Sequence, residues 1–184
     1  MPDHVKKILS KIHDEVLTRY YGCGLIAPHD LEGMSILDLG CGAGNNTRFL
    51  ASLGCQVDAI DGSSSAVAVA TKRLAADGLS AEVVVGDFRS LPYDDARFDC
   101  VIDRGSVTHN RRADIEATFA EVQRVLKPGG VFFSQMFSTA HRDRAYGTPL
   151  GDGSYDAFTD GYFADIALTF FASEEDIVEL FFDG

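Results

Sequence analysis

The sequence predicts a doubly wound α/β fold built on a mostly parallel sheet, and three features of the chain lead to this prediction. Short apolar runs alternate with helical patterns from residue 35 to residue 137. A glycine-rich turn, Gly40-Cys41-Gly42-Ala43-Gly44, joins the first of these runs to the helix that follows. The chain has 184 residues, 46% of them hydrophobic and 24% charged, which is enough for one domain with a sizeable core.

The first expected element is an amphipathic helix over residues 3–19. Its apolar stripe consists of Val5, Ile8, Leu9, Ile12 and Val16. A turn-rich stretch follows as far as Gly33, and the alternation of strands and helices begins after it.

The alternating part of the chain predicts parallel strands joined by helices. The strands are expected at residues 35–39, 56–60, 82–85, 98–103 and 131–137. Helices are expected at residues 46–53, 64–76 and 113–126, and a further capped helix from residue 173 towards residue 182. Residues 127–130, Lys-Pro-Gly-Gly, end the third of these helices because proline and glycine do not continue it. Residues 138–161 are rich in Gly, Asp and Tyr and are expected to form a loop.

Charge and composition exclude several kinds of function. The net charge is −12, from 16 Lys and Arg against 28 Asp and Glu, and this sign disfavours a nucleic-acid partner. No apolar run approaches the length of a membrane-spanning helix, and the N-terminus lacks the apolar core of a signal peptide. The cysteines are widely spaced without a Cys-x-x-Cys pair, so we expect reduced thiols, a cytoplasmic protein and no metal site.

The glycine-rich turn is the strongest functional signal. At a strand-to-helix turn, glycines let a ligand approach the backbone, and the helix N-terminus offers unpaired N–H donors. The spacing is Gly-x-Gly-x-Gly, with Asn45 where a dinucleotide-binding turn would have its third small residue. Asp38 comes just before the first glycine and adds a carboxylate. The alternative interpretation is a tight turn without a ligand.

Polar residues also follow the second and third strands, at the sheet edge where ligands bind in such folds. Asp61 ends the second strand, and its two oxygens suit the two hydroxyls of a ribose; the alternative is an N-cap for the next helix. Asp87 and Phe88 follow the third strand, where a carboxylate can accept an adenine amine and the ring can cover the base. The alternative for this pair is an ordinary Gly-Asp turn.

The loop after the fourth strand carries Asp103, Arg104 and His109. An imidazole suits proton transfer near neutral pH, which makes His109 a candidate catalytic base. A surface position in the loop is the alternative interpretation of this histidine.

Taken together, five segments resemble a class I S-adenosylmethionine-dependent methyltransferase. They are ILDLGCGAGNNT, VDAIDGS, GDF, FDCVIDRGSVTH and RVLKPGGVFF, and they cover about residues 34–137 in the family's order. The resemblance implies a Rossmann-like sheet with strand order 3-2-1-4-5 and S-adenosylmethionine as the cofactor. It also implies that the family's two C-terminal strands are missing from this chain.

The resemblance further implies a cofactor site. For the methionine part of the cofactor the residues are Asp38, Gly40, Gly42 and Gly44. Asp61 would hold the ribose, Asp87 with Phe88 the adenine, and Arg104 with Gly105 would border the sulfonium end. The remaining members of the expected site are Tyr20, Cys41, Asn46, Gly62, Ser63 and Gly86.

For methyl transfer the protein supplies binding, orientation and exclusion of water, and a general base helps when the acceptor is a hydroxyl or an acidic carbon. His109 is the first candidate base, with Tyr20, Tyr21 and His141 behind it. The chain has no Asn-Pro-Pro-Tyr signature of methylases of DNA bases, so with its acidic charge it is expected to act on a small molecule. Residues 1–33 are expected to cover cofactor and acceptor, and residues 34–184 to form the core of a single domain.

A narrower resemblance lies upstream, where residues 12–25 are similar to the entry segment of arsenite methyltransferases. That family binds trivalent arsenic through several cysteines, of which Cys23 has a match here, while Gly105 stands where another is expected. We therefore interpret Cys23 as a small residue that packs over the cofactor. Arsenite methylation stays open as an alternative, together with a non-catalytic S-adenosylmethionine-binding module and a nicotinamide-dependent oxidoreductase.

The expected fifth strand, residues 131–137, is strongly apolar and has no further strand beside it. Exposed strand edges pair readily with other chains. The sequence therefore predicts a homodimer or another form of edge-strand pairing.

Overall fold

The computed structural model of the chain describes residues 31–166 and 168–182. The expected N-terminal helix, together with Tyr20, Tyr21 and Cys23, lies outside the described residues. Among the helices that are described, none is long and apolar enough to cross a membrane.

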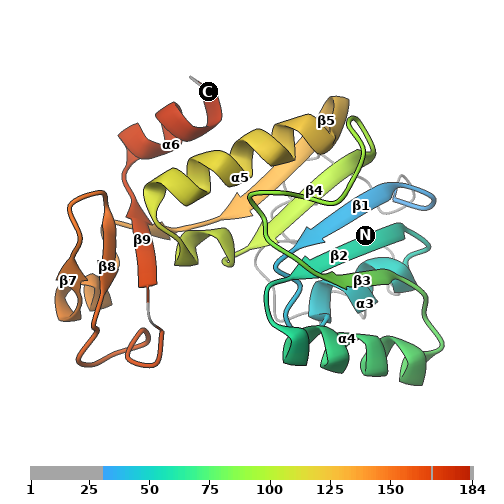
Figure 1. The fold of residues 1–184 in the computed structure, drawn as a ribbon, viewed down its shortest axis with the longest axis horizontal. Coiled ribbons are helices and arrows are strands. Elements are labelled where there is room, and N and C mark those ends of the chain that lie inside the picture. The colour runs from blue at the N-terminus through green and yellow to red at the C-terminus, as the bar shows by residue number, and fades with distance from the viewer. Residues whose placement is uncertain (1–30, 167, 183–184) are drawn as a thin grey trace, which may run out of the picture.

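A five-stranded sheet with order β3-β2-β1-β4-β5 forms the centre of the described chain (Figure 1), which confirms the predicted order. Each neighbouring pair in this sheet is parallel. The strands are β1 (Ser35–Leu39), β2 (Gln56–Asp61), β3 (Glu82–Val85), β4 (Phe98–Arg104) and β5 (Leu126–Gln135).

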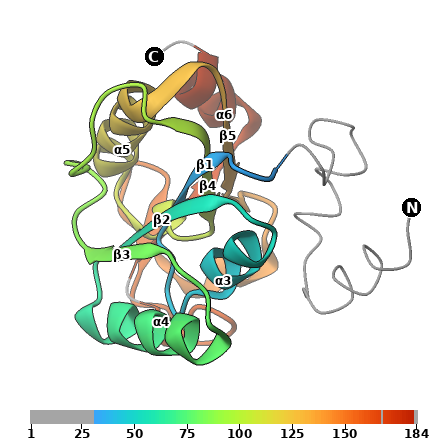
Figure 2. The ribbon, with the colours of Figure 1, turned by 90° about the vertical axis from the view of Figure 1, so that its right-hand side faces the viewer.

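Helices cover both faces of this sheet (Figure 2), as a parallel sheet requires. They are α3 (Asn45–Ser52), α4 (Ser64–Asp77), α5 (Arg112–Val125) and α6 (Glu174–Phe182). Neighbouring residues of a strand point to opposite faces, so Leu37 packs in the cluster that contains α5 residues and Ile36 in the cluster that contains Leu50 of α3.

Among the strands and helices that the structure describes, the predicted bounds hold to within one or two residues except in the fifth strand. β5 begins at Leu126 instead of residue 131 and ends at Gln135 instead of residue 137. Phe98 pairs with Leu126 and Cys100 with Val131, so the residues between Leu126 and Val131 bulge out of the strand. The Lys-Pro-Gly-Gly segment therefore ends α5 and is at the same time part of β5.

The prediction of a plain loop at residues 138–161 was incomplete. A small second sheet with order β6-β9-β8-β7 lies beyond the carboxyl ends of β4 and β5 (Figure 1). It consists of β6 (Phe137–Ser138), β7 (Thr148–Pro149), β8 (Ser154–Asp156) and β9 (Leu168–Ala172), with a 3₁₀-helix at Arg142–Tyr146. Phe158, Phe163 and Phe171 form its buried core. β6, β7 and β8 have only two or three residues each, too few for an alternation to show in the sequence.

β5 is the terminal strand of the large sheet, and among the described residues its partner there is β4. One face of β5 is nevertheless covered, because the Phe132 ring lies 5.0 Å from the Phe119 ring of α5 and 5.7 Å from the Phe181 ring of α6. Ser173 and Asp176 exchange hydrogen bonds at the start of α6, the predicted cap. The strand edge that we expected to be exposed is therefore the hydrogen-bonding edge of β5, because helices cover this face.

Candidate functional site

The glycine-rich turn is held between the ends of β1 and β2. The backbone N–H groups of Gly40 and Cys41 both donate to the carbonyl of Ile60, at 2.8 and 3.1 Å. The N–H of Gly42 donates to Oδ2 of Asp61 at 2.8 Å. The carboxylate that ends β2 thus fixes the turn that follows β1.

Three glycines of the turn have positive φ, but for different reasons. At Gly40, with φ +76°, an added Cβ would lie 2.1 Å from Oγ of Ser106, so only glycine fits. At Gly44, with φ +77°, it would lie 2.9 Å from Cβ of Ala70 in α4. At Gly42, with φ +53°, it would meet no atom of the described residues within 4 Å. The turn is packed at its two ends and open in the middle, where a ligand can approach the backbone.

Asp38 is buried, with 1% of its surface exposed. Its Oδ2 accepts a hydrogen bond from the Thr47 hydroxyl at 2.5 Å, while Oδ1 has no hydrogen-bond partner within the described part of the chain. Burial raises the pKa of Asp38 to about 6. A buried carboxylate oxygen without a donor is matched by a ligand that brings N–H groups or positive charge.

Asp38 is expected to make the stability of the ligand-free chain depend on pH. The folded state binds the Asp38 proton more tightly than the unfolded state, so the stabilisation is complete below about pH 4 and is lost as the pH rises through about 6. Two pKa units correspond to about 3 kcal/mol. Relative to Asp38→Asn, the parent should therefore lose about 3 kcal/mol of unfolding free energy between pH 4 and pH 7. Urea unfolding of both proteins across this range measures the difference, and parallel pH profiles would contradict the prediction.

Asp61 uses both of its oxygens within the protein. Besides the Gly42 contact, Oδ1 accepts from the N–H of Ser63 at 2.8 Å. The cap of α4 is Ser63, whose hydroxyl accepts from the N–H of Ala66 at 3.3 Å. Asp61 is therefore not the N-cap that the alternative interpretation expected. Each carboxylate oxygen has a second acceptor position, which remains compatible with a ligand.

The ends of β2 and β3 pack closely together. At Gly86 an added Cβ would lie 2.6 Å from Cδ1 of Ile60, and at Gly62 the nearest such contact is the Gly86 carbonyl oxygen at 3.9 Å. Gly86 is thus fixed by packing inside the protein, whereas Gly62 has room around it.

Asp87 is already engaged by a neighbour that sequence reasoning did not consider. Its carboxylate forms an ion pair with Arg89, with Nη2 to Oδ2 at 2.6 Å, and Arg89 also reaches Asp114 at 2.9 Å. Hydrogen bonds from Arg89 lower the pKa of Asp87 to about 2. Phe88, in contrast, reaches the glycine turn, because its ring atom Cζ lies 3.3 Å from the position of a Cβ at Gly40. The structure brings Phe88 to the expected site and gives Asp87 a different partner.

The loop after β4 is folded by Asp103. Its fully buried carboxylate accepts from the N–H and hydroxyl of Ser106, from the N–H of Val107, and from the Ser134 hydroxyl. The Ser106 hydroxyl also donates to the Leu39 carbonyl at 2.7 Å, which places this loop directly on the glycine turn. Asp103 therefore shapes the site from within the protein.

Three other predicted residues lie around this loop. The Arg104 guanidinium donates to the Asn46 side chain of α3 at 3.1 Å, so these two residues lie together. Gly105 has φ +76°, which suits the turn after β4. Cys41 is buried, and burial raises the pKa of its thiol to about 12, so the thiol is neutral at physiological pH.

His109 ends the 3₁₀-helix at Val107–His109 and contacts the second sheet. Its Nδ1 lies 3.0 Å from the Leu168 carbonyl oxygen and 3.1 Å from the Thr169 hydroxyl of β9. His141 is the N-cap of the 3₁₀-helix between β6 and β7, where its Nδ1 accepts from the N–H of Asp143 at 3.3 Å and its ring packs on Phe163 of the small sheet's core. The first of these histidines thus joins the two sheets, and the second packs on the small sheet.

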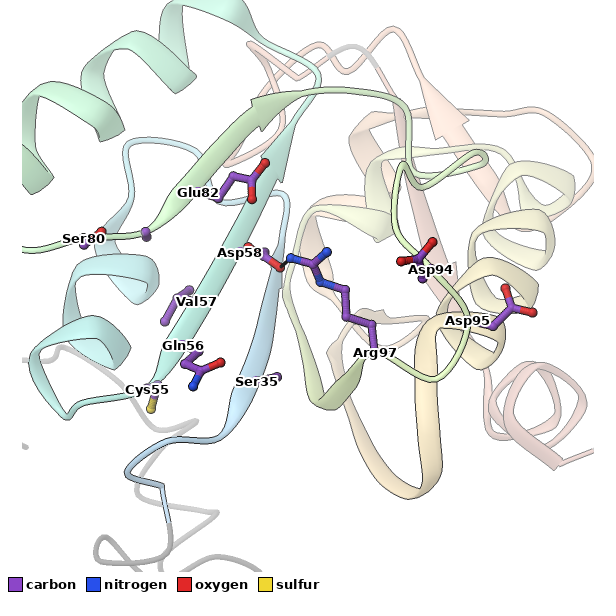
Figure 3. Close-up of a pocket in the computed structure, with 11 residues that line it drawn as sticks. Ser35, Cys55, Gln56, Val57, Asp58, Ser80, Glu82, Asp94, Asp95 and Arg97 are labelled. Carbon is purple, nitrogen blue, oxygen red and sulfur yellow. Dashed lines mark hydrogen bonds and ion pairs between the residues drawn. The ribbon is translucent and has the colours of Figure 1, made fainter.

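A cavity of about 690 Å³ lies at the opposite, amino-terminal edge of the large sheet (Figure 3). Its walls include the strand starts Ser35, Gln56 and Glu82, and Arg97 forms an ion pair with Asp58 at 2.6 Å on one side. None of the predicted site residues within the described part of the chain lines it. This cavity is therefore separate from the site at the carboxyl edge.

Comparison with known proteins identifies similar sequences and structures. The family model described as a methyltransferase domain matches residues 36–130, slightly more than half of the chain. An arsenite methyltransferase of Aquipseudomonas alcaligenes is 35% identical over 155 residues, which cover 78% of this chain and 43% of the relative. A sterol 24-C-methyltransferase of Aspergillus fumigatus is 34% identical over 134 residues, which cover 66% of this chain and 35% of the relative.

A solved structure of an S-adenosylmethionine-dependent methyltransferase from Methanosarcina mazei is also similar. It is 27% identical with a TM-score of 0.70, and the match covers 83% of this chain and 79% of that chain. The chain spans less than half the length of the curated relatives that it matches.

Proposed function

Because the chain belongs to the S-adenosylmethionine-dependent methyltransferases, we propose that it transfers a methyl group from S-adenosylmethionine to a small-molecule acceptor. The geometry of the turn after β1 carries the proposal: it is open at Gly42, where the N–H is bonded to Asp61, and just before it Asp38 has a buried oxygen without a donor among the described residues. When bound, the cofactor supplies a methyl group activated by a sulfonium. The net charge of −12 supports a small acceptor over a nucleic acid, and the free described cysteines support a cytoplasmic location.

The residues of the turn are well suited to hold this cofactor. Asp38 would accept N–H groups of the methionine part through Oδ1, and Gly42 would let that part approach the backbone. Asp61 would use its remaining acceptor positions for the ribose hydroxyls while it keeps the turn in place. Phe88 would cover the adenine, whereas Asp87 would first have to release Arg89 before it could accept the adenine amine.

The similarity to arsenite methyltransferases makes arsenite the second candidate acceptor. The described cysteines do not favour it. Cys41, Cys55 and Cys100 are all buried, and burial raises the pKa of each thiol to about 11 or 12. Among the described residues, no three His, Cys, Asp or Glu side chains are grouped so that they could hold a metal ion. Soft arsenic needs converging thiolates, so we favour an acceptor that is not a metalloid.

The deciding experiment measures S-adenosylhomocysteine release across classes of small molecule that include arsenite. We expect turnover with at least one organic acceptor and none with arsenite. Calorimetric titration with S-adenosylmethionine and with NAD accompanies the screen. Binding of S-adenosylmethionine without any turnover would favour a non-catalytic binding module, and binding of NAD alone would overturn the proposal.

Replacing His109 by asparagine should lower turnover by about 10²–10⁴-fold if His109 is the general base. Asparagine keeps an N–H donor near the position of Nδ1 but has nothing at the position of Nε2. The affinity for S-adenosylmethionine should stay within about twofold, because His109 lies outside the glycine turn. His141→Asn is the matched control and should keep most of the turnover. Equal losses in both variants would remove His109 from the base role.

A further inference from the structure

We propose that β9 sets the tautomer of the neutral His109 ring. The Leu168 carbonyl and the Thr169 hydroxyl hold the proton of the neutral ring on Nδ1, which leaves Nε2 to accept a proton from the methyl acceptor. This inference rests on the proposed function and narrows it. The acceptors of this site are then molecules that lose a proton on methylation, such as a hydroxyl or an acidic carbon.

The hydrogen-bonding chemistry of the contact leads to this assignment. A carbonyl oxygen can only accept, so the nitrogen 3.0 Å from the Leu168 oxygen must carry the proton. With the proton on Nε2, the Nδ1 lone pair would face the carbonyl oxygen, and this partly buried hydrogen bond would be lost. Once the Leu168 carbonyl fixes the proton on Nδ1, the hydroxyl of the fully buried Thr169 serves as a second acceptor for the same N–H. Thr169 is therefore a positioning residue that acts through His109.

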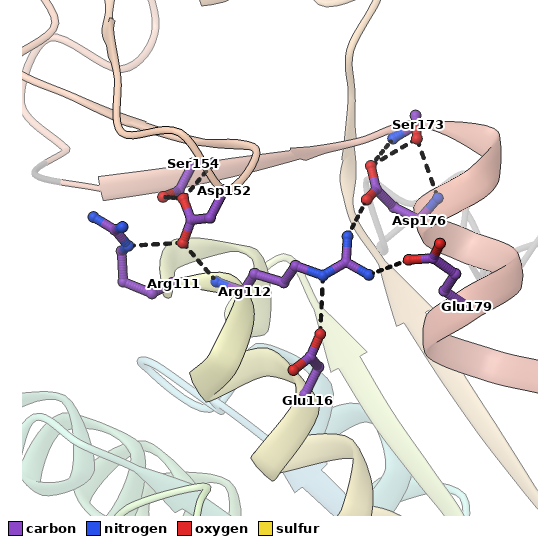
Figure 4. Close-up of polar contacts among 8 residues, drawn as sticks. All are labelled: Arg111, Arg112, Glu116, Asp152, Ser154, Ser173, Asp176 and Glu179. Atoms are coloured by element: carbon purple, nitrogen blue, oxygen red, sulfur yellow. Dashed lines mark hydrogen bonds and ion pairs between the residues drawn. The ribbon is translucent and has the colours of Figure 1, made fainter. Parts of the chain in front are cut away.

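The loop that carries His109 is fixed by contacts of residues before and after this histidine in the sequence. On one side, Ser106 packs against Gly40, and the buried Thr108 hydroxyl donates to the Phe170 carbonyl of β9 at 2.8 Å. On the other side, Nε of Arg111 lies 2.8 Å from the Asp152 carboxylate, which belongs to the loop before β8 (Figure 4).

The Asp152 carboxylate also accepts from the N–H of Arg112, in the first turn of α5, and from Ser154 at the start of β8 (Figure 4). The second sheet and the loop after β4 thus form one connected unit. His109 is held against β9 by its neighbours as well as by its own ring.

Nitrogen-15 NMR of histidine-labelled protein tests the inference without any acceptor or cofactor. The His109 signals are identified by their loss in His109→Asn, and the spectrum is recorded at a pH where the ring is neutral. We expect an Nδ1 signal of the protonated type and an Nε2 signal of the unprotonated type, with at least a tenfold excess of this tautomer. An excess of the Nε2–H tautomer in the parent protein would overturn the inference.

Two variants of Thr169 separate its role from simple packing. Thr169→Ser keeps the hydroxyl and should keep the tautomer excess, whereas Thr169→Val keeps the shape and the strand preference but should lower the excess at least twofold. An unchanged ratio in the valine variant would exclude Thr169 as a positioning residue. If the tautomer is found but no proton-losing acceptor releases S-adenosylhomocysteine, the proposed function fails while the effect of β9 on His109 stands.

Discussion

Gly40→Ala should lower the unfolding free energy by about 3–5 kcal/mol, the largest stability effect that we expect from a single substitution in the site. The positive φ of +76° costs an alanine about 1–2 kcal/mol. The new Cβ would overlap Oγ and Cβ of Ser106, at 2.1 and 2.2 Å, and overpacking of this kind costs about 1–3 kcal/mol. Moving Ser106 away would relieve this overlap but break its bonds to Leu39 and Asp103, at about 1 kcal/mol each, so this cost would replace that of the overlap.

Gly33→Ala is the matched control for this substitution. Gly33 has a similar φ of +81°, but an added Cβ there meets no described atom within 4 Å. The unfolding free energy of Gly33→Ala should therefore fall only by the backbone cost of the positive φ, about 1–2 kcal/mol. Urea unfolding of both variants gives the comparison. Equal losses would show that the contact between Ser106 and Gly40 contributes nothing to the cost.

Asp61→Ala should weaken binding of S-adenosylmethionine by about 1.5–3 kcal/mol, which is about 10- to 150-fold in affinity. The substitution removes the expected acceptor of the ribose hydroxyls. It also removes the anchors of the Gly42 and Ser63 N–H groups, so the turn loses the shape that the cofactor needs. Calorimetric titration measures the loss directly.

Asp58→Ala is the control on the same strand. Asp58 lies towards the amino-terminal end of β2, where it pairs with Arg97. Its replacement should lower stability but leave the affinity for the cofactor within about twofold. If Asp61→Ala binds as tightly as the parent while remaining folded, Asp61 is not a cofactor ligand.

The large sheet could be predicted because each of its strands and helices is indicated by residues that are close together in the sequence. Each strand is a short apolar run, each helix has a start or stop residue, and Gly40 and Asp61 stand at strand ends. The contact between His109 and β9 joins residues about sixty positions apart, and no periodicity records such a pairing.

Other features of the site depend on which of several possible partners a side chain takes. Asp87 forms an ion pair with Arg89, two residues further along the chain. The same sequence is equally compatible with a turn in which the Asp87 carboxylate has no such partner. Asp103 stood at the predicted edge, but its four hydrogen bonds to Ser106, Val107 and Ser134 follow only from the fold of the loop. The residue types of the site could be predicted, and their partners could not.

The pairing of β6 with β9 closes the chain between Ser138 and Phe171 into a loop whose two ends lie side by side. The entropy needed to close such a loop grows only with the logarithm of its length, at about 0.6 kcal/mol for each doubling. Length changes in the turns of this excursion therefore cost little closure entropy, whereas the buried Phe158 and Phe163, and Thr169 beside His109, are fixed by their contacts. The closely packed contact of Gly40 with Ser106 permits no such variation. The chain thus combines a closely packed glycine turn with a second sheet whose connecting turns can change in length at little thermodynamic cost.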